Sequence, residues 1–249
     1  MNTKLPQPTF NVWDLPLRLF HWMLVASIAV AFLSSDEDSA FAGWHIAAGW
    51  VAAVLIVFRL VWGFVGGEHA RFANFIRPSR AFAHLKHLAS GRAERTVGHN
   101  PAGGMAVLLL IGSIAAVVAT GWLALQGGEE VLHEGIAWFL LGLIGVHIAA
   151  VIATSILSRE NLVRAMVTGR KKSADHKGVW RVRSVSPAAF LLAVAASGVA
   201  VAGIRSLDPN AFSQQQLERA ERADGDAAEG TGTAGTAEPS EDEGKDDRD

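Results

Sequence analysis

The stretch His133–His147, HEGIAWFLLGLIGVH, is an apolar run with a histidine at each end. The histidines are 14 residues apart, so an α-helix would separate them by about 21 Å along its axis and keep them within about 40° of one direction. An ionisable ring inside a hydrocarbon layer is costly unless something binds it. The stretch therefore predicts a membrane helix in which each histidine has a partner at its own depth.

Other apolar stretches also approach the roughly 20 residues needed to cross a bilayer. The complete set covers residues 15–33, 44–65, 104–125, 133–157 and 187–204. We expect an all-α integral membrane protein, with a four-helix bundle domain in residues 1–175 and an additional fifth C-terminal transmembrane helix in residues 185–205. A cleaved signal peptide is the alternative for the first stretch, because SSDEDSAFA after it ends in small residues. Charged and aromatic residues before its apolar part argue against cleavage.

The loops between these stretches differ in charge. Residues 34–43 and 126–132 contain acidic residues but no Lys or Arg, whereas residues 66–103 are basic and residues 158–184 contain eight Lys or Arg. Basic loops stay on the cytoplasmic side, which places the N-terminus inside and the end of the fifth span outside. Residues 206–249 contain thirteen acidic and four basic residues and few bulky apolar ones, so we expect a disordered acidic tail.

The composition limits which cofactors the chain can hold. There is no cysteine, which excludes disulfides, Cys-ligated iron–sulfur clusters and the thioether attachment of c-type haem. Tyrosine, another haem ligand, is also absent. Any metal or cofactor must be held by His, Met, carboxylate or backbone groups.

Two further histidines match the depths of the first two. His21 lies early in the first span, on the predicted inner side, and His45 opens the second span, on the predicted outer side. Depth therefore pairs His21 with His147, here called the inner pair, and His45 with His133, the outer pair. Two histidines at each of two levels is the arrangement that bis-imidazole ligation of two stacked haems requires, and a four-helix bundle core provides the space.

Two arginines accompany the histidines at the inner level. Arg18 precedes His21 by one helical turn, and Arg59 follows His45 by 14 residues. Either guanidinium can pair with the carboxylates of haem propionates. The alternative for both is an interfacial anchor that extends its charge to water. An intramembrane charge should find a partner, which favours the propionate interpretation for Arg59.

Small residues and loop histidines complete the candidate set. Glycines that leave room for a flat macrocycle or a neighbouring helix are Gly49, Gly142 and Gly145. The remaining histidines fall in loops, where we interpret them as solvated: His69, His84, His87, His99 and His176.

Several motifs together resemble the bacterial cytochrome b561 family. They are VWDLPLRLFHW (12–22), HIAAGWVAAVLIVFRLVWGFVGG (45–67), GHNPAGG (98–104) and the helix with histidines at 133 and 147. The family includes the b-type cytochrome subunit of nickel–iron hydrogenases, and the chain resembles more distantly the membrane subunit of formate dehydrogenase. The similarity covers about residues 10–172. It implies a four-helix transmembrane bundle with two b haems, ligated by His21, His45, His133 and His147.

The resemblance also implies an activity and partners. We expect a di-haem b-type cytochrome that transfers electrons across a bacterial inner membrane between a quinone pool and a redox protein. The N-terminus is expected in the cytoplasm and the C-terminus in the periplasm. Expected partners are membrane lipid, quinone or quinol, and a hydrogenase-like enzyme, dehydrogenase or c-type cytochrome, with no nucleic acid. The sequence shows no group of residues typical of a catalytic acid, base or nucleophile. Quinol oxidation at a haem edge is therefore the one candidate catalytic activity.

Other functional classes use the same residues differently. One is a cofactor-binding membrane anchor subunit, and another is a metal transport protein or metal enzyme with histidine ligands. The zinc protease motif HExxH is incomplete in HEGIA, because residue 137 is Ala. The two histidine levels are also about 21 Å apart, which is too far for one metal site.

Overall fold

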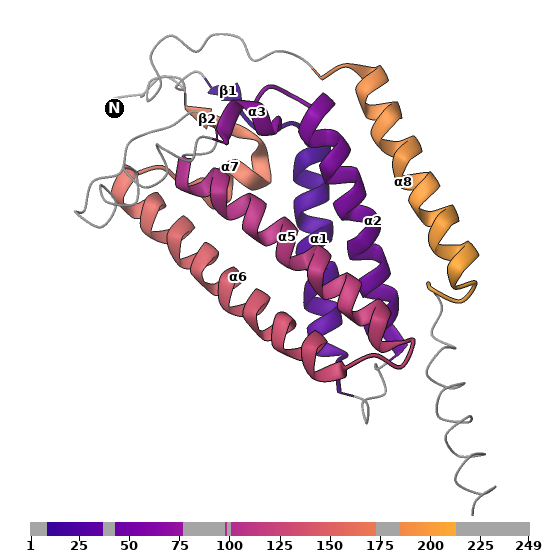
Figure 1. The fold of residues 1–249 in the computed structure, drawn as a ribbon. Helices are drawn as coiled ribbons and strands as arrows, with labels where there is room; N and C mark the ends of the chain where they lie inside the picture. Colours follow the sequence, from indigo (N-terminus) through magenta and orange to yellow (C-terminus); the bar gives the residue numbers. More distant parts are fainter. Residues whose placement is uncertain (1–8, 37–42, 77–97, 99–100, 173–184, 213–249) are drawn as a thin grey trace, which may run out of the picture.

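Helices make up most of the described chain. The computed structural model describes residues 9–36, 43–76, 98, 101–172 and 185–212. Its elements are β1 (Thr9–Asn11), α1 (Leu15–Leu33), α2 (Gly43–Val65), α3 (Phe72–Phe75), α5 (Pro101–Ala124), α6 (Glu130–Ser158), α7 (Leu162–Thr168), β2 (Arg170–Lys172) and α8 (Pro187–Leu207). In Figure 1, α1 and α2 run side by side, α5 passes across them, and α8 lies along the outer side of α2.

Five of the described helices are long and apolar enough to cross a membrane: α1, α2, α5, α6 and α8. They correspond to the five stretches that hydropathy selects, so the predicted all-α membrane fold is confirmed. The helix expected in residues 185–205 corresponds to α8. Most of the expected acidic tail, residues 213–249, lies outside the described residues.

The start of α1 follows from its sequence. Asp14 is the N-cap, and its Oδ1 accepts a hydrogen bond from the backbone N–H of Leu17 at 2.8 Å. A carboxylate in this position satisfies one of the helix's free N–H groups. Pro16 stands in the first turn, where the N–H that it lacks has no intrahelical partner.

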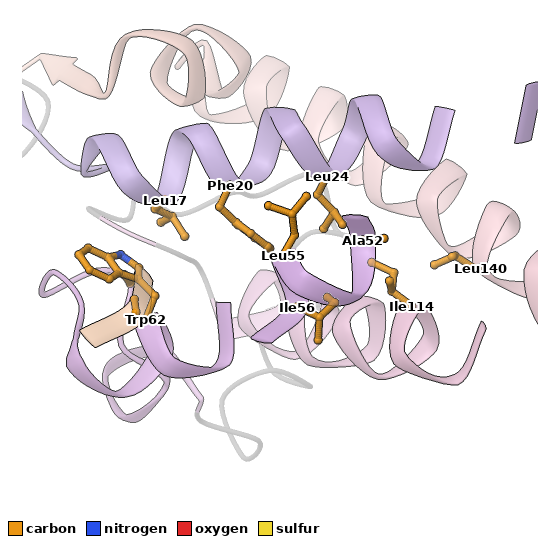
Figure 2. Packing of buried hydrophobic residues seen from close by; sticks show 11 residues of the cluster. Leu17, Phe20, Leu24, Ala52, Leu55, Ile56, Trp62, Ile114 and Leu140 are labelled. Carbon is orange, nitrogen blue, oxygen red and sulfur yellow. The ribbon is translucent and has the colours of Figure 1, made fainter. Parts of the chain in front are cut away.

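The bundle is built from two closely packed pairs, α1 with α2 and α5 with α6, joined where α2 meets α5. Figure 2 shows Phe20 and Leu24 of α1 directed at Leu55 and Ala52 of α2, with Leu17 next to Trp62. Ile114 of α5 and Leu140 of α6 extend this core toward the second pair. In contrast, α1 and α6 make at most marginal backbone contact with each other. The helices that carry the inner pair are therefore not in close contact.

A short ribbon ties the first and last parts of the bundle together at one end. β1 pairs antiparallel with β2, with Thr9 opposite Lys172 and Asn11 opposite Arg170. Next to it, the Lys171 ammonium lies 3.2 Å from a Glu160 carboxylate oxygen, and both side chains are buried. The segment before α1 and the segment after α7 therefore share one side of the bundle, as the loop charges predict. Which side of the membrane this is stays a prediction.

Candidate functional site

The outer pair brings two imidazoles from different helices face to edge. His45 lies in the first turn of α2 and His133 in the first turn of α6. Their ring centres are 6.0 Å apart and their planes are nearly perpendicular, at 89°. Two imidazoles on opposite sides of one metal ion, with metal–nitrogen bonds of about 2 Å, have ring centres roughly 6 Å apart. The spacing therefore fits a bis-imidazole site.

Hydrogen bonds fix the tautomer of both outer imidazoles. The Nδ1–H of His45 donates to the carbonyl of Ala31 near the end of α1, at 2.8 Å. The Nδ1–H of His133 donates to the carbonyl of Val117 on α5, at 3.0 Å. A carbonyl can only accept, so Nδ1 carries the proton in each ring. Nε2 is then the nitrogen available to a metal, which is the usual arrangement for ligating histidines.

The inner pair comes from α1 and α6. His21 of α1 and His147 of α6 are close enough to interact electrostatically. Among the described residues, no hydrogen bond to either ring is found. A Cβ added at Gly142 or Gly145 of α6 would meet no heavy atom within 4 Å. The same holds for Gly49 of α2, so no neighbouring helix fills the space beside these glycines.

Arg59 is a fully buried cation near the inner end of α2. Its side chain is 1% exposed, and its two terminal nitrogens have no hydrogen-bond partner among the described residues. Its guanidinium carbon lies 4.5 Å from the centre of the Phe72 ring, and it interacts electrostatically with Asp14. Phe72 reaches this position because residue 63 is glycine, where a Cβ would overlap its ring. A buried charge without hydrogen bonds is costly, so this guanidinium is suited to an anionic partner.

Asp14 has a second role beyond capping α1. The indole N–H of Trp62, which is completely buried, donates to Asp14 Oδ1 at 3.1 Å and lies 3.3 Å from Oδ2. Both residues lie within the quoted motifs, but their order in the sequence assigns neither a function. The Asp-Leu-Pro order signals the helix cap, whereas the indole contact joins residues 48 positions apart and needs the fold.

Arg18 is held at the inner end by the last turn of α7. Its Nη1–H donates to the carbonyl of Val167 at 2.6 Å, while its buried Nε has no partner among the described residues. Gly169 ends α7 with a φ of 77°, a backbone conformation that favours glycine. Arg18 also lines a cavity of about 410 Å³ together with Asp14, Glu68 and others. One terminal nitrogen of this candidate residue is thus already used by the protein.

The interpretation of His69 as a solvated loop residue is wrong. Its ring is half-buried and meets Trp13 edge-on, with ring centres 6.5 Å apart. Burial lowers the pKa of His69, and Glu68 opposes that effect. The chain after α2 folds back against the start of α1, which a loop composition does not reveal. His84, His87, His99 and His176 lie outside the described residues.

The donor set limits the metal chemistry. Within the described ranges, no group of three or more His, Cys, Asp or Glu residues could hold a metal ion. A metal ion with only protein ligands commonly needs three or four of them. Two imidazoles at a level suit an iron that brings four equatorial nitrogens of its own, as in haem.

Comparison with known proteins shows where the chain has relatives. A family model described as prokaryotic cytochrome b561 matches residues 12–169. A probable Ni/Fe-hydrogenase B-type cytochrome subunit of Azotobacter vinelandii is 26% identical over 221 residues, covering 69% of this chain and 92% of the relative. A protein of the same description in Bradyrhizobium diazoefficiens is 23% identical, and the match covers 68% of this chain and 88% of the relative. One in Rhodobacter capsulatus is 24% identical, and the match covers 67% of this chain and 82% of the relative. No solved structure matches the chain significantly.

Proposed function

Because the chain belongs to the prokaryotic cytochrome b561 family, we propose that it is a di-haem cytochrome that transfers electrons across the bilayer. Family membership and the membrane-spanning helices make it a multi-pass bacterial membrane protein and a b-type cytochrome of electron transfer. The proposal adds the number of haems, their ligands and the two redox partners. His45 and His133 bind one haem, and His21 and His147 bind the other.

The observation that carries this proposal is the outer pair. Two imidazoles from α2 and α6 stand 6.0 Å apart, and each directs its Nδ1–H away to a backbone carbonyl. An ordinary helix contact between two histidines does not require both rings to present Nε2 as the free nitrogen. The inner pair supports the proposal through the proximity of its two rings and the limited contact between α1 and α6.

Haem b supplies a one-electron iron couple at each level. The protein's part is to fix the ligand tautomers, exclude water and satisfy the charges of the cofactor. Arg59 supports this assignment, because a buried guanidinium without hydrogen-bond partners suits a propionate. Arg18 is the second candidate, with its Nε still available.

The proposed redox partners are a quinone in the membrane and a membrane-associated enzyme. The relatives are named as B-type cytochrome subunits of Ni/Fe hydrogenases, and this chain covers 92% of the length of one of them. A hydrogenase-like enzyme is therefore the first partner to test, before other dehydrogenases or a c-type cytochrome. Of the competing functions, metal transport lacks a three-ligand metal cluster among the described residues.

The number of haems tests the central claim. We expect two haems b for each chain, and acid acetone should extract both, because the chain has no cysteine to attach them. A pyridine haemochrome assay on the purified protein, normalised to quantitative amino-acid analysis, measures the ratio. One haem per chain, or none, would contradict the two-level arrangement.

Orientation in the membrane is tested separately. We propose that the N-terminus is cytoplasmic and the C-terminus periplasmic, because the loop of residues 158–184 contains eight Lys or Arg and α8 follows it. A reporter fused after residue 175 should read cytoplasmic, and one fused at the C-terminus should read periplasmic. Two cytoplasmic readings would mean that α8 does not cross the membrane.

A further inference from the structure

α5 carries none of the four proposed ligands, yet it forms one wall of the outer level. Its second half lies against the first turn of α6, where His133 begins the sequence stretch with two histidines. The contacts come from about one helical turn of α5 and involve Val117, Thr120 and Gly121. Nothing in the sequence pattern predicts a role for these three residues.

The hydroxyl of Thr120 is a second acceptor for the His133 ring. The side chain is buried, and its Oγ1 lies 3.3 Å from Nδ1 of His133. The hydroxyl is within donating distance of two carbonyls of its own helix, that of Ala116 at 2.9 Å and that of Val117 at 3.1 Å. Because the hydroxyl donates to its own helix, its lone pairs are available to accept from the imidazole. The Nδ1–H of His133 is thus shared between the Val117 carbonyl and the Thr120 hydroxyl.

Gly121 fixes the position of the same ring. A Cβ added at residue 121 would lie 2.9 Å from Cε1 and 3.2 Å from Nδ1 of His133. Real Cβ atoms are not found this close to ring atoms, so any larger residue would move the imidazole or the helix. The imidazole therefore lies directly on the backbone of α5, within reach of both acceptors.

We propose that Thr120 and Gly121 are positioning residues for His133, and that the Thr120 hydroxyl strengthens Nε2 of His133 as a ligand. This rests on the proposed function, in which Nε2 binds the outer haem iron. When Nδ1–H donates a hydrogen bond to an acceptor, the other ring nitrogen, Nε2, becomes more basic and donates its electron pair more strongly to a metal. A stronger donor stabilises the ferric state, so the hydroxyl should lower the potential of the outer haem.

His45 provides an internal comparison. Its Nδ1–H has a single acceptor, the carbonyl of Ala31 at 2.8 Å. That acceptor belongs to the backbone and cannot be removed by substitution. The Thr120 hydroxyl is the one side-chain acceptor found for either outer ring among the described residues. It is therefore the acceptor that a substitution can remove.

The test compares Thr120→Val, which removes the hydroxyl and keeps the shape, with Thr120→Ser, which keeps the hydroxyl. We expect both variants to retain two haems. Thr120→Val should raise the midpoint potential of the outer haem alone, and Thr120→Ser should restore it. Redox titration of the two low-spin signals by electron paramagnetic resonance measures each haem separately. Thr154→Val, at a buried threonine of α6, is the matched control and should shift neither potential.

The outcomes separate this inference from the proposed function. A wild-type protein without two haems contradicts the proposed function itself. Two haems with an unchanged outer potential in Thr120→Val, or equal shifts of both haems, overturn the role of Thr120 alone. If Thr120→Val loses the outer haem, restoration by Thr120→Ser supports the inference, and a loss shared by Thr120→Ser overturns it. Gly121→Ala should weaken or remove the outer signal only.

Discussion

The outer and inner levels of the bundle use the same residue type in different surroundings. At the outer level, His45 and His133 are 6.0 Å apart, and each ring is fixed by a backbone carbonyl. At the inner level, His21 and His147 interact electrostatically, and no described residue forms a hydrogen bond with either ring. Hydrogen bonds to backbone carbonyls thus fix the outer rings, whereas among the described residues no such bond fixes the inner rings.

The charges near the two levels also differ. The inner level has the buried Arg59 and, at the end of the bundle, Arg18. The outer end has acidic residues on α6, including Glu130 and Glu134. Positive charge favours the reduced state of a cofactor, and negative charge or a stronger ligand favours the oxidised state. If both levels hold haem, the inner haem should have the higher midpoint potential.

The largest expected effect is the loss of one haem signal at one level. His21→Ala and His147→Ala should remove the same inner signal, and His45→Ala and His133→Ala the outer signal, because each substitution leaves iron without one of its two axial imidazoles. Electron paramagnetic resonance of the low-spin signals across the four variants measures this.

The double variant His21→Ala/His147→Ala tests whether two residues serve one site. It should resemble its single variants, because effects within one site are not additive. The division into two levels fails if His21→Ala and His133→Ala remove one common signal while His147→Ala removes the other.

Periodicity and hydropathy were sufficient for the fold and for the grouping of the histidines. A 14-residue spacing fixes the depth difference along any straight helix, and α6 is one continuous helix from Glu130 to Ser158. The charged loops predicted that the two ends joined by β1 and β2 share a side. Those features depend on local geometry, which the order of residues largely determines.

The contacts around the histidines could not be predicted in the same way. Thr120 and Gly121 contact His133 from another helix, and their distance in sequence carries no signal. Asp14 could be found as a helix cap, but its bond to Trp62 depends on how α1 packs on α2. The burial of His69 could not be predicted, because it comes from the chain after α2 folding back against the start of α1 and not from neighbours in sequence.

The next effect in size concerns Arg59. We expect Arg59→Met to lower the midpoint potential of the inner haem and leave the outer one nearly unchanged, because a buried positive charge is removed from one level only. A change of tens of millivolts is expected, since about 1.4 kcal/mol corresponds to roughly 60 mV for one electron. The measurement is a redox titration resolved by the two low-spin signals.

Arg205 of α8 is the matched control, because it is an exposed arginine in the last turn of a membrane-spanning helix. Arg205→Met should leave the inner potential unchanged. Equal shifts of both haems in Arg59→Met would mean that Arg59 acts through the overall charge of the protein and does not distinguish the levels.

The smallest effect is expected at Asp14. Two substitutions there distinguish the effect of its negative charge from the effect of its hydrogen bonds. Oδ1 accepts from both the Leu17 N–H and the Trp62 indole, so Asp14→Asn can keep both bonds while removing the negative charge near Arg59. The inner potential should rise by less than Arg59→Met lowers it, and the thermal transition in detergent should hardly move. Asp14→Ala also loses the cap, at a cost of about 0.5–2 kcal/mol, and should lower that transition. An unchanged inner potential in Asp14→Asn would show that the carboxylate's charge does not act on the inner level, and a fall would contradict the expected sign. In either case the electrostatic difference between the levels would rest on Arg59 alone.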